Sequence, residues 1–552
     1  MASEVKRGLI RISSNYIRLF INVVLGLLMV RWILQGMGDE AFGLIALLGA
    51  SVGIASEVKE ISKRSLIREV AAAYHSGDDL HLKTVYNSAI ALSFVLAGLS
   101  FLIFLIIVLI VPLLKISPGL EHAARWFLIA KGVESAAFVL LAPQHNMYLI
   151  TERMSSHNLF LLVDRSWPAA AALAVLLMRI PDPAHGVIVY GWMSALGSVV
   201  GILVWSLWMV LRIDRRLIPD LKLARRSALK GIVKMGGWNF VTVTAMNLHI
   251  RLDAILMNLF FGLVGNAAFG LANTLSNYVR RLTMGMTDGL DAVSARVAAD
   301  KGSTKLGSLI YHSTRLHAVV AFPAAAVILA LSYPIIDQWV GTKVTDPAVI
   351  PTAVAIMQAL VIGIATRSIT DGWTRILYGA GHIDKYGPLI LLGGLLNAPT
   401  AIFLIWMLPP PHDMLGPALA FSIVFTIFHM FLLPVIGART IRVRYWEFIR
   451  PIIGPAVLTA VTVPALLAAR RFIHEWNLLT LGAVIGAYGA LYGVAAIFFL
   501  MSADERRMFI RGFARRIQGK ADKEERRARK KARREALAAA GISNTNDAGP
   551  DQ

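Results

Sequence analysis

Long apolar stretches recur along almost the whole chain and are separated by short polar segments. A bilayer core is crossed by about 20 apolar residues in a helix, because helices and closed barrels satisfy all backbone hydrogen bonds there. The pattern predicts an all-α polytopic membrane protein with about fourteen transmembrane helices. The predicted spans are 10–34, 41–59, 85–114, 124–141, 159–178, 186–211, 236–263, 267–290, 314–340, 351–377, 388–408, 415–436, 452–469 and 478–500.

Composition excludes an ordinary soluble enzyme. The chain is 56% hydrophobic and 16% charged, whereas soluble domains are about 45–50% apolar and about 25% charged. It has no cysteine, which excludes disulfides, thiol nucleophiles and cysteine metal sites. No P-loop, nucleophile-elbow or zinc-protease motif occurs. We therefore expect no catalytic residues, no metal and no cofactor, and a protein that is not an enzyme.

The chain carries 55 Lys and Arg against 34 Asp and Glu, a net charge of +21. These basic residues gather in alternate loops, which is typical of cytoplasmic loops. The opposite loops hold only Lys115, Arg179, Lys343, Arg470 and Arg471. The alternation predicts an even number of spans and two cytoplasmic termini. It also explains the basic charge without nucleic acid. Residues 520–535 are a predicted basic helix that attracts anionic lipids.

Two halves of the chain carry matching motifs. GDEAFGL occupies 38–44 and GNAAFGL occupies 265–271, an offset of 227. Further short matches in the same order pair 70–72 with 297–299 and 181–183 with 409–411. Such order indicates duplication, with helices 1–6 and 7–12 as two six-helix lobes about a pseudo-twofold axis along the membrane normal.

The domain prediction follows from the duplication. It has an N-terminal lobe, a basic cytoplasmic linker, a C-terminal lobe, helices 13 and 14, and a basic cytoplasmic tail with a disordered end. The predicted boundaries are 1–211, 212–235, 236–437, 438–501 and 502–552.

Polar residues recur on one face of helix 1, because Asn15, Arg18 and Asn22 are three and four residues apart. An arginine near mid-bilayer costs about 2.5–3.5 kcal/mol, so this stripe should face a polar cavity. Similar stripes mark two later helices. Helix 7 carries Asn247 and Arg251, and helix 8 carries Asn273, Asn277, Arg280 and Arg281.

Acidic residues within the spans have several explanations. Asp253 is two residues from Arg251, so the two should have different partners. Glu134 is three residues from Lys131 and should pair with it, either structurally or as a carboxylate that binds and releases a proton. The spacing of Arg367, Asp371 and Arg375 predicts an ion ladder near the cytoplasmic surface.

The motif LQGMGDEAFGL after a polar first helix, the run RLDAILMNLFFGLVGNAAFGLANTLSNYVRRL, and ILYGAGHIDKYG occur in this order. Over residues 8–440 the chain resembles the multidrug/oligosaccharidyl-lipid/polysaccharide (MOP) exporter superfamily, and within it the polysaccharide transporter branch of Wzx-like flippases. The resemblance implies export of lipid-linked oligosaccharide across the bacterial inner membrane. It also implies that two lobes alternate in access around a cavity lined by helices 1, 2, 7 and 8.

The expected substrate is a polyprenyl-diphosphate-linked oligosaccharide, such as an exopolysaccharide, O-antigen or capsule precursor. Its anionic head group needs cations, which the polar stripes supply, and Asp253 and Glu134 are candidates for ion coupling. Expected partners are this lipid, anionic membrane lipids at the tail and polysaccharide biosynthesis proteins. The candidate binding residues are Asn15, Arg18, Asn22, Asn247, Arg251, Asn273, Asn277, Arg280 and Arg281.

Three other functions are weighed. A cation-coupled multidrug antiporter of the same superfamily should line its cavity with carboxylates rather than arginines. A membrane glycan polymerase or ligase should have a large external loop, and none is visible in the sequence. A structural scaffold leaves the duplicated polar stripes unexplained.

Overall fold

The computed structural model describes residues 2–55, 69–151, 153–287, 289–299, 303–501 and 506, although the side chains of 2–17, 226–245 and a few other residues are outside the described set. Helices and turns make up this part of the chain, and it contains no strand. Eleven of its helices are long and apolar enough to cross a membrane, or twelve if a bent pair is one span. The predicted all-α polytopic architecture is therefore confirmed.

The two longest helical segments fold back on themselves at single glycines. α1 (Ala2–Ala55) turns at Gly38 with φ +82°, and α8 (Arg226–Thr287) turns at Gly262 with φ +68°. Glycine reaches these backbone angles without strain. Val23 and Ala46 lie on opposite arms of α1, yet both contact the second arm of α8. The two arms of α1 therefore lie beside each other.

The remaining helices mostly overlap the predicted spans. They are α3 (Asp79–Ile110), α4 (Glu121–Leu140), α5 (Ala142–Ile150), α6 (Met154–Met178), α7 (Pro183–Trp208), α9 (Leu290–Ala299), α10 (Ser303–Val340), α11 (Val349–Gly379), α12 (Ile383–Met407), α13 (Gly416–Phe425), α14 (Leu433–Ile441), α15 (Trp446–Phe472) and α16 (Leu478–Phe499). However, α5 and α9 are short helices that no predicted span covers, and α10 begins eleven residues before the predicted 314. α8 begins ten residues before the predicted 236, because its first turns, RSALKGIVKM, mix polar and apolar residues and escape a search for apolar runs.

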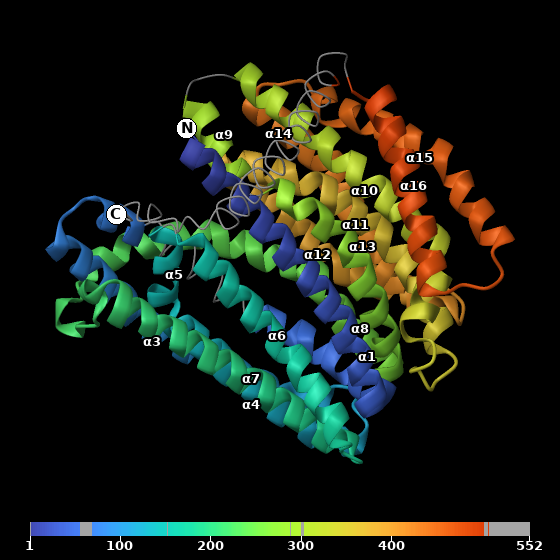
Figure 1. The fold of residues 1–552 in the computed structure, drawn as a ribbon, viewed down its shortest axis with the longest axis horizontal. Helices are drawn as coiled ribbons and strands as arrows, with labels where there is room; N and C mark the ends of the chain where they lie inside the picture. Colours follow the sequence, from blue (N-terminus) through green and yellow to red (C-terminus); the bar gives the residue numbers. More distant parts are fainter. Residues whose placement is uncertain are drawn as a thin grey trace, which may run out of the picture. The chain divides into compact units, whose positions relative to one another are not determined.

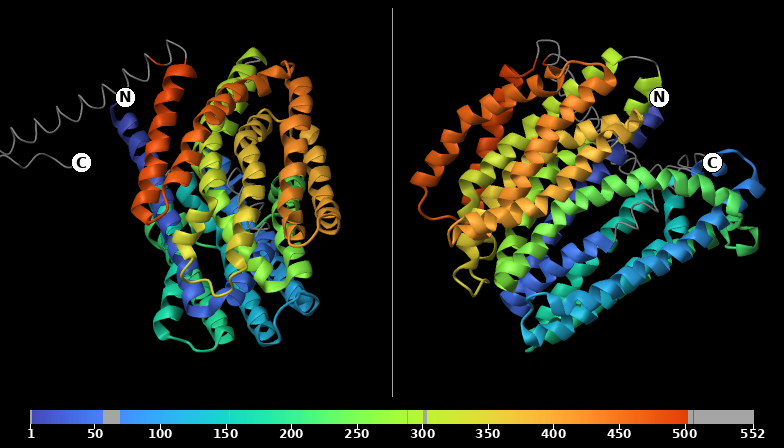
Figure 2. Two further views of the ribbon diagram at one scale, coloured as in Figure 1. Left: turned by 90° about the vertical axis from the view of Figure 1, so that its right-hand side faces the viewer. Right: turned by 180° about the vertical axis from the view of Figure 1, so that it is seen from behind.

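The helices pack in two groups (Figure 1). α3, α4, α6 and α7 pack against one another, and α1 packs on α6 and α7. The second group is α8 with α10, α11, α12 and α13, and α15 packs on α10. α1 and α8 pack against each other and join the groups, which Figure 2 shows from two further directions.

An ion-pair network ties the segment after α7 to the start of α3. Arg216 donates to Asp214 through Nε at 2.9 Å and Nη2 at 2.7 Å, and through Nη1 to Asp79 at 2.8 Å. The hydrogen bonds from Arg216 lower the pKa of the Asp214 carboxyl below its ordinary value. This cluster anchors the basic linker outside the membrane spans.

The chain divides into two compact units, 1–486 and 487–552. All helices from α1 to α15 belong to the first unit, and the sites below lie within it. The charged extension at 56–68 and, apart from Arg506, the predicted basic tail from 502 lie outside the described residues.

Candidate functional site

The first arm of α1, which carries the polar stripe, contacts the second arm of α8 at Val23. Arg18 and Asn22 are half-buried, and within the described residues Asn22 Oδ1 has no hydrogen-bond partner. Tyr278 Oη donates to the Val23 carbonyl at 3.4 Å, next to this stripe. The side chain of Asn15 is outside the described set. The structure therefore places Asn22 next to the residue of α1 that contacts α8.

The first arm of α8 places Arg251 against the second arm of α1. Arg251 Nε donates to Asn247 Oδ1 at 2.8 Å, and Nη1 donates to the Gly49 carbonyl at 3.5 Å. A side chain at Gly53 would overlap the Arg251 guanidinium. Asp253 is instead buried against α12, where its Oδ1 accepts a hydrogen bond from Asn397 Nδ2 at 2.8 Å. The prediction that Arg251 and Asp253 have different partners is confirmed.

The second arm of α8 supplies further cations. Asn277 Nδ2 donates to Asn273 Oδ1 at 2.7 Å, and Arg280 Nε donates to Asp371 Oδ2 at 2.7 Å. Arg281 lies over the Tyr278 ring, 4.9 Å from its centroid.

Arg281 has no ion pair with a carboxylate of the described chain, whereas its neighbour Arg280 is paired with Asp371. Arg281 is therefore a cation of the second arm of α8 that no acidic side chain of the described residues neutralises. Arg165 of α6 is a further charged residue within a predicted span, and it stands next to Asp164 in the sequence.

The predicted ladder on helix 10 is not at the surface. Asp371 pairs with Arg280 of α8 at 2.7 Å and lies 3.9 Å from Arg367, and its side chain is only 15% exposed. Arg375 pairs with Asp291 of α9 instead, at 3.8 Å. The surface placement was wrong because α11 packs against both α8 and α9, which the spacing along one helix cannot reveal.

Glu134 forms the predicted pair with Lys131, with Nζ to Oε2 at 2.6 Å. Lys131 also donates to Ser194 Oγ at 3.0 Å, which ties the pair to α7. No hydrogen bond or ion pair among the described residues joins Glu134 to Asp253, which lies between α8 and α12. The structure therefore does not unite the two predicted coupling carboxylates.

Two polar residues next to the glycine turns were missed. Asp39 Oδ2 accepts hydrogen bonds from Thr345 N (2.8 Å), Thr345 Oγ1 (2.8 Å) and Asp346 N (2.9 Å). Asn258 accepts from Lys115 N at 2.9 Å and donates to the Lys115 carbonyl at 3.0 Å. Asp39 stands in the GDEAFGL motif, so the repeat itself was the available signal.

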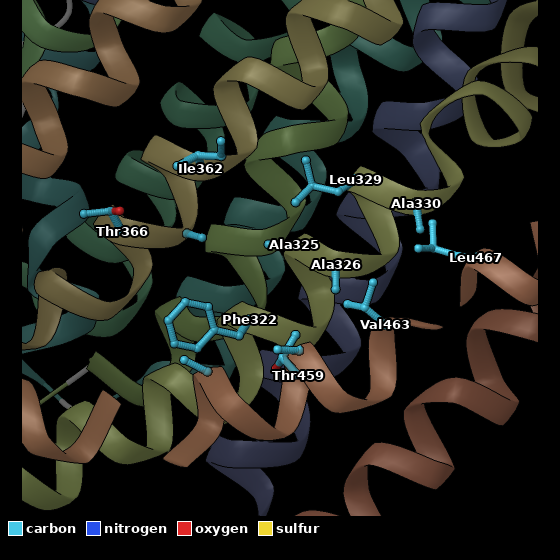
Figure 3. A pocket seen from close by; sticks show the side chains of 13 residues that line it. Phe322, Ala325, Ala326, Leu329, Ala330, Ile362, Thr366, Thr459, Val463 and Leu467 are labelled. Carbon is cyan, nitrogen blue, oxygen red and sulfur yellow. The ribbon is translucent and has the colours of Figure 1, made fainter. Parts of the chain in front are cut away.

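The structure has one mainly apolar pocket and one pocket lined by several acidic residues. One, of about 440 Å³, lies between α10, α11 and α15 (Figure 3); Thr366 and Thr459 are its polar lining residues, and it holds none of the predicted binding residues. The other, of about 510 Å³, lies at the glycine turns and includes Asp39, Asp182 and Asp346 in its lining. Within the described chain no three His, Asp or Glu side chains are grouped to hold a metal ion.

No family model matches the chain, and no curated protein matches its sequence. Solved structures do match. "Lipid II flippase MurJ, inward closed conformation" has a TM-score of 0.65 and 13% identity, over 88% of this chain and 98% of that one. An inward-facing multidrug resistance MATE transporter of the MOP superfamily has a TM-score of 0.65 and 13% identity, over 77% of this chain and 98% of that one.

A third match is the MATE multidrug transporter DinF-BH, with a TM-score of 0.56 and 16% identity over 78% of this chain and 94% of that one. Identities this low establish the fold alone. The chain therefore has the fold of the multi-pass membrane transporters of the MOP superfamily. That fold is the one which the sequence resemblance implied.

Proposed function

We propose that the chain is a flippase for polyprenyl-diphosphate-linked oligosaccharide, working by alternating access in the bacterial inner membrane. The observation that carries this proposal is Arg281, an arginine of the second arm of α8 without a carboxylate partner in the described chain. Its guanidinium lies over the Tyr278 ring, 4.9 Å from the ring centroid. A guanidinium group can donate two parallel hydrogen bonds to two oxygens of one phosphate, so an anionic diphosphate would neutralise this charge.

The proposed architecture has fourteen crossings, since each arm of α1 and of α8 counts as one. The first lobe ends with α7, the second runs from α8 to α14, and α15 and α16 stand outside the duplication. Contacts between the hairpins support the pseudo-twofold axis. Val23, before the turn of α1, contacts Tyr278, after the turn of α8; Arg251, before the turn of α8, contacts Gly49, after the turn of α1.

The proposed domains keep the boundaries 1–211, 236–437 and 438–501, with the linker 212–235 and the tail from 502. Both termini lie in the cytoplasm, as the distribution of basic loops indicates. The glycine turns Gly38 and Gly262 then lie on the periplasmic side. Anionic lipids at the basic tail and polysaccharide biosynthesis proteins are the proposed partners.

Asp253 is the better supported of the two coupling carboxylates. It is buried, it accepts a hydrogen bond from the neutral Asn397, and no basic side chain of the described residues forms an ion pair with it. Glu134 is already neutralised by Lys131. A buried carboxylate without a cation is a natural place for a transported proton or sodium ion.

A multidrug antiporter is the alternative, because MATE transporters share the fold. One observation favours the flippase. Arg281, which has no carboxylate partner in the described chain, would attract an anionic head group rather than a cationic drug.

The first prediction concerns Arg281→Gln. We expect export of lipid-linked glycan to fall about tenfold or more, since hydrogen bonds to charged groups contribute about 1.5–3 kcal/mol. Arg281→Lys should keep part of the activity, because it keeps the charge. The measurement is surface polysaccharide in a deletion strain that carries each variant, with the amount of membrane-inserted protein determined in parallel.

The matched control is Arg125→Gln, which removes an exposed arginine paired with Glu121 on α4. It should export normally. Normal glycan export by Arg281→Gln, combined with drug efflux by the unaltered protein, would favour the antiporter and refute the flippase.

A further inference from the structure

Two hydrogen-bonded contacts join the proposed lobes at the end that carries the glycine turns. The first lies between Asp39 of α1 and residues 345–346, and the second lies between Asn258 of α8 and Lys115. We propose that Asp39 and Asn258 are gate residues, and that both contacts must break before the passage can open at this end. The proposal rests on the alternating-access transporter proposed above.

The Asp39 contact concentrates three donors on one carboxylate oxygen. Asp39 directly follows the turn at Gly38 and is only 6% exposed. Its Oδ2 accepts two main-chain N–H groups and the Thr345 hydroxyl, all from the segment between α10 and α11. Hydrogen bonds to a charged acceptor are stronger than neutral ones. Asp39 thereby holds a loop of the second lobe to a helix of the first.

In the Asn258 contact, a helix of the second lobe binds a loop of the first lobe. Asn258 is fully buried shortly before the turn at Gly262, and its amide bonds both the N–H and the carbonyl of Lys115. Lys115 Nζ also donates to the Phe260 carbonyl at 3.3 Å. The two contacts are therefore reciprocal between the lobes, although Asp39 follows the turn of α1 and Asn258 precedes the turn of α8.

Both contacts close the same end of the molecule. A side chain at Gly43 would overlap the main chain of Leu263, so the two turns lie side by side. The hydrogen-bonded contacts at the turns therefore favour a conformation that is closed at this end.

The second carboxylate oxygen of Asp39 is consistent with a contact that forms and breaks. Asp39 Oδ1 is buried without a hydrogen-bond partner in the described structure, beside the pocket that includes Asp182 and Asp346 in its lining. A buried acceptor without a hydrogen bond costs free energy. The contact is therefore less stable than one in which both oxygens of Asp39 accept hydrogen bonds. A purely structural contact would be expected to satisfy both oxygens.

The test uses the absence of cysteine from the chain. The variant Asp39→Cys with Thr345→Cys joins the two lobes when treated with a short bifunctional methanethiosulfonate reagent. We expect cross-linking to lower transport about tenfold or more, and reductant to restore it, because a locked gate removes the second conformation. Recovery after reduction proves that the variant is folded.

The control pair is Glu40→Cys with Ser117→Cys. These neighbours are hydrogen-bonded at 2.7 Å within the first lobe, from Ser117 Oγ to Glu40 Oε2. Cross-linking this pair should leave transport unchanged. Equal transport by the cross-linked and reduced forms of the Asp39–Thr345 pair would overturn the gate.

A second measurement does not depend on the substrate. A single cysteine replaces Asn22, and a membrane-impermeant maleimide is added from the side of the turns. Asp39→Ala together with Asn258→Ala should raise the labelling rate about tenfold, because a weakened gate opens more often. Unchanged labelling refutes the gate. Raised labelling in this variant, together with no glycan export by the unaltered protein, supports the gate and refutes the proposed substrate.

Discussion

Asp371 is a single carboxylate between two arginines of different helices, Arg280 and Arg367. Asp371→Asn would leave both cations buried without their acidic partner. Breaking a buried ion pair costs about 3–5 kcal/mol, so we expect a large fall in melting temperature in detergent, measured by intrinsic fluorescence. Glu121→Gln is the control; its pair with Arg125 is exposed, and such pairs contribute at most about 1 kcal/mol. Similar shifts for both variants would contradict a stabilising role for Asp371.

Side-chain partners within one helix were predictable from spacing. Lys131 and Glu134 pair as expected, and Arg251 and Asp253 have separate partners. The partner of Arg280 was not predictable, because Asp371 lies on another helix and helix spacing contains no information about neighbours across an interface.

The hairpins α1 and α8 depend on one residue each. Gly38→Ala would place a β-carbon on a residue with φ +82° and ψ −179°, a region that is almost restricted to glycine and costs other residues about 1–3 kcal/mol. We expect a lower melting temperature and less protein in the membrane. Gly98→Ala is the matched control, because a β-carbon on Gly98 in α3 would meet no atom within 4 Å; it should be neutral or slightly stabilising. An unchanged melting temperature and membrane level for Gly38→Ala would contradict the need for glycine at this turn.

The apolar pattern located nearly every helix, because a bilayer demands long runs of one polarity. It did not locate both turns. The repeat aligned Gly265 with Gly38, but the turn of α8 is at Gly262, about one helical turn earlier. Several glycines stand close together there, and composition does not reveal which of them has the positive φ.

The orientation of the whole chain can be measured independently of its substrate. Single cysteines at Thr342, between α10 and α11, and at Arg444, between α14 and α15, are both at exposed positions. If both termini are cytoplasmic, an impermeant maleimide added to intact cells should label the cysteine at 342 and not the one at 444. In permeabilised cells both cysteines should be labelled. The reverse pattern in intact cells would refute the proposed topology.

The fold of the molecule could be anticipated from the order of its motifs, since the solved MurJ and MATE structures match it at 13% identity. The contacts between the lobes could not. Asp39 and Asn258 bind segments far away in the sequence, and their partners are mostly main-chain groups, which have no sequence signature.

Because Asn258 binds main-chain atoms, the identity of the partner residue can change during evolution without loss of the contact. Lys115 offers Asn258 only its peptide N–H and carbonyl, which every amino acid except proline would supply equally well, since proline alone lacks the N–H. We therefore expect homologues to carry many different residues at position 115 and to keep the asparagine at 258.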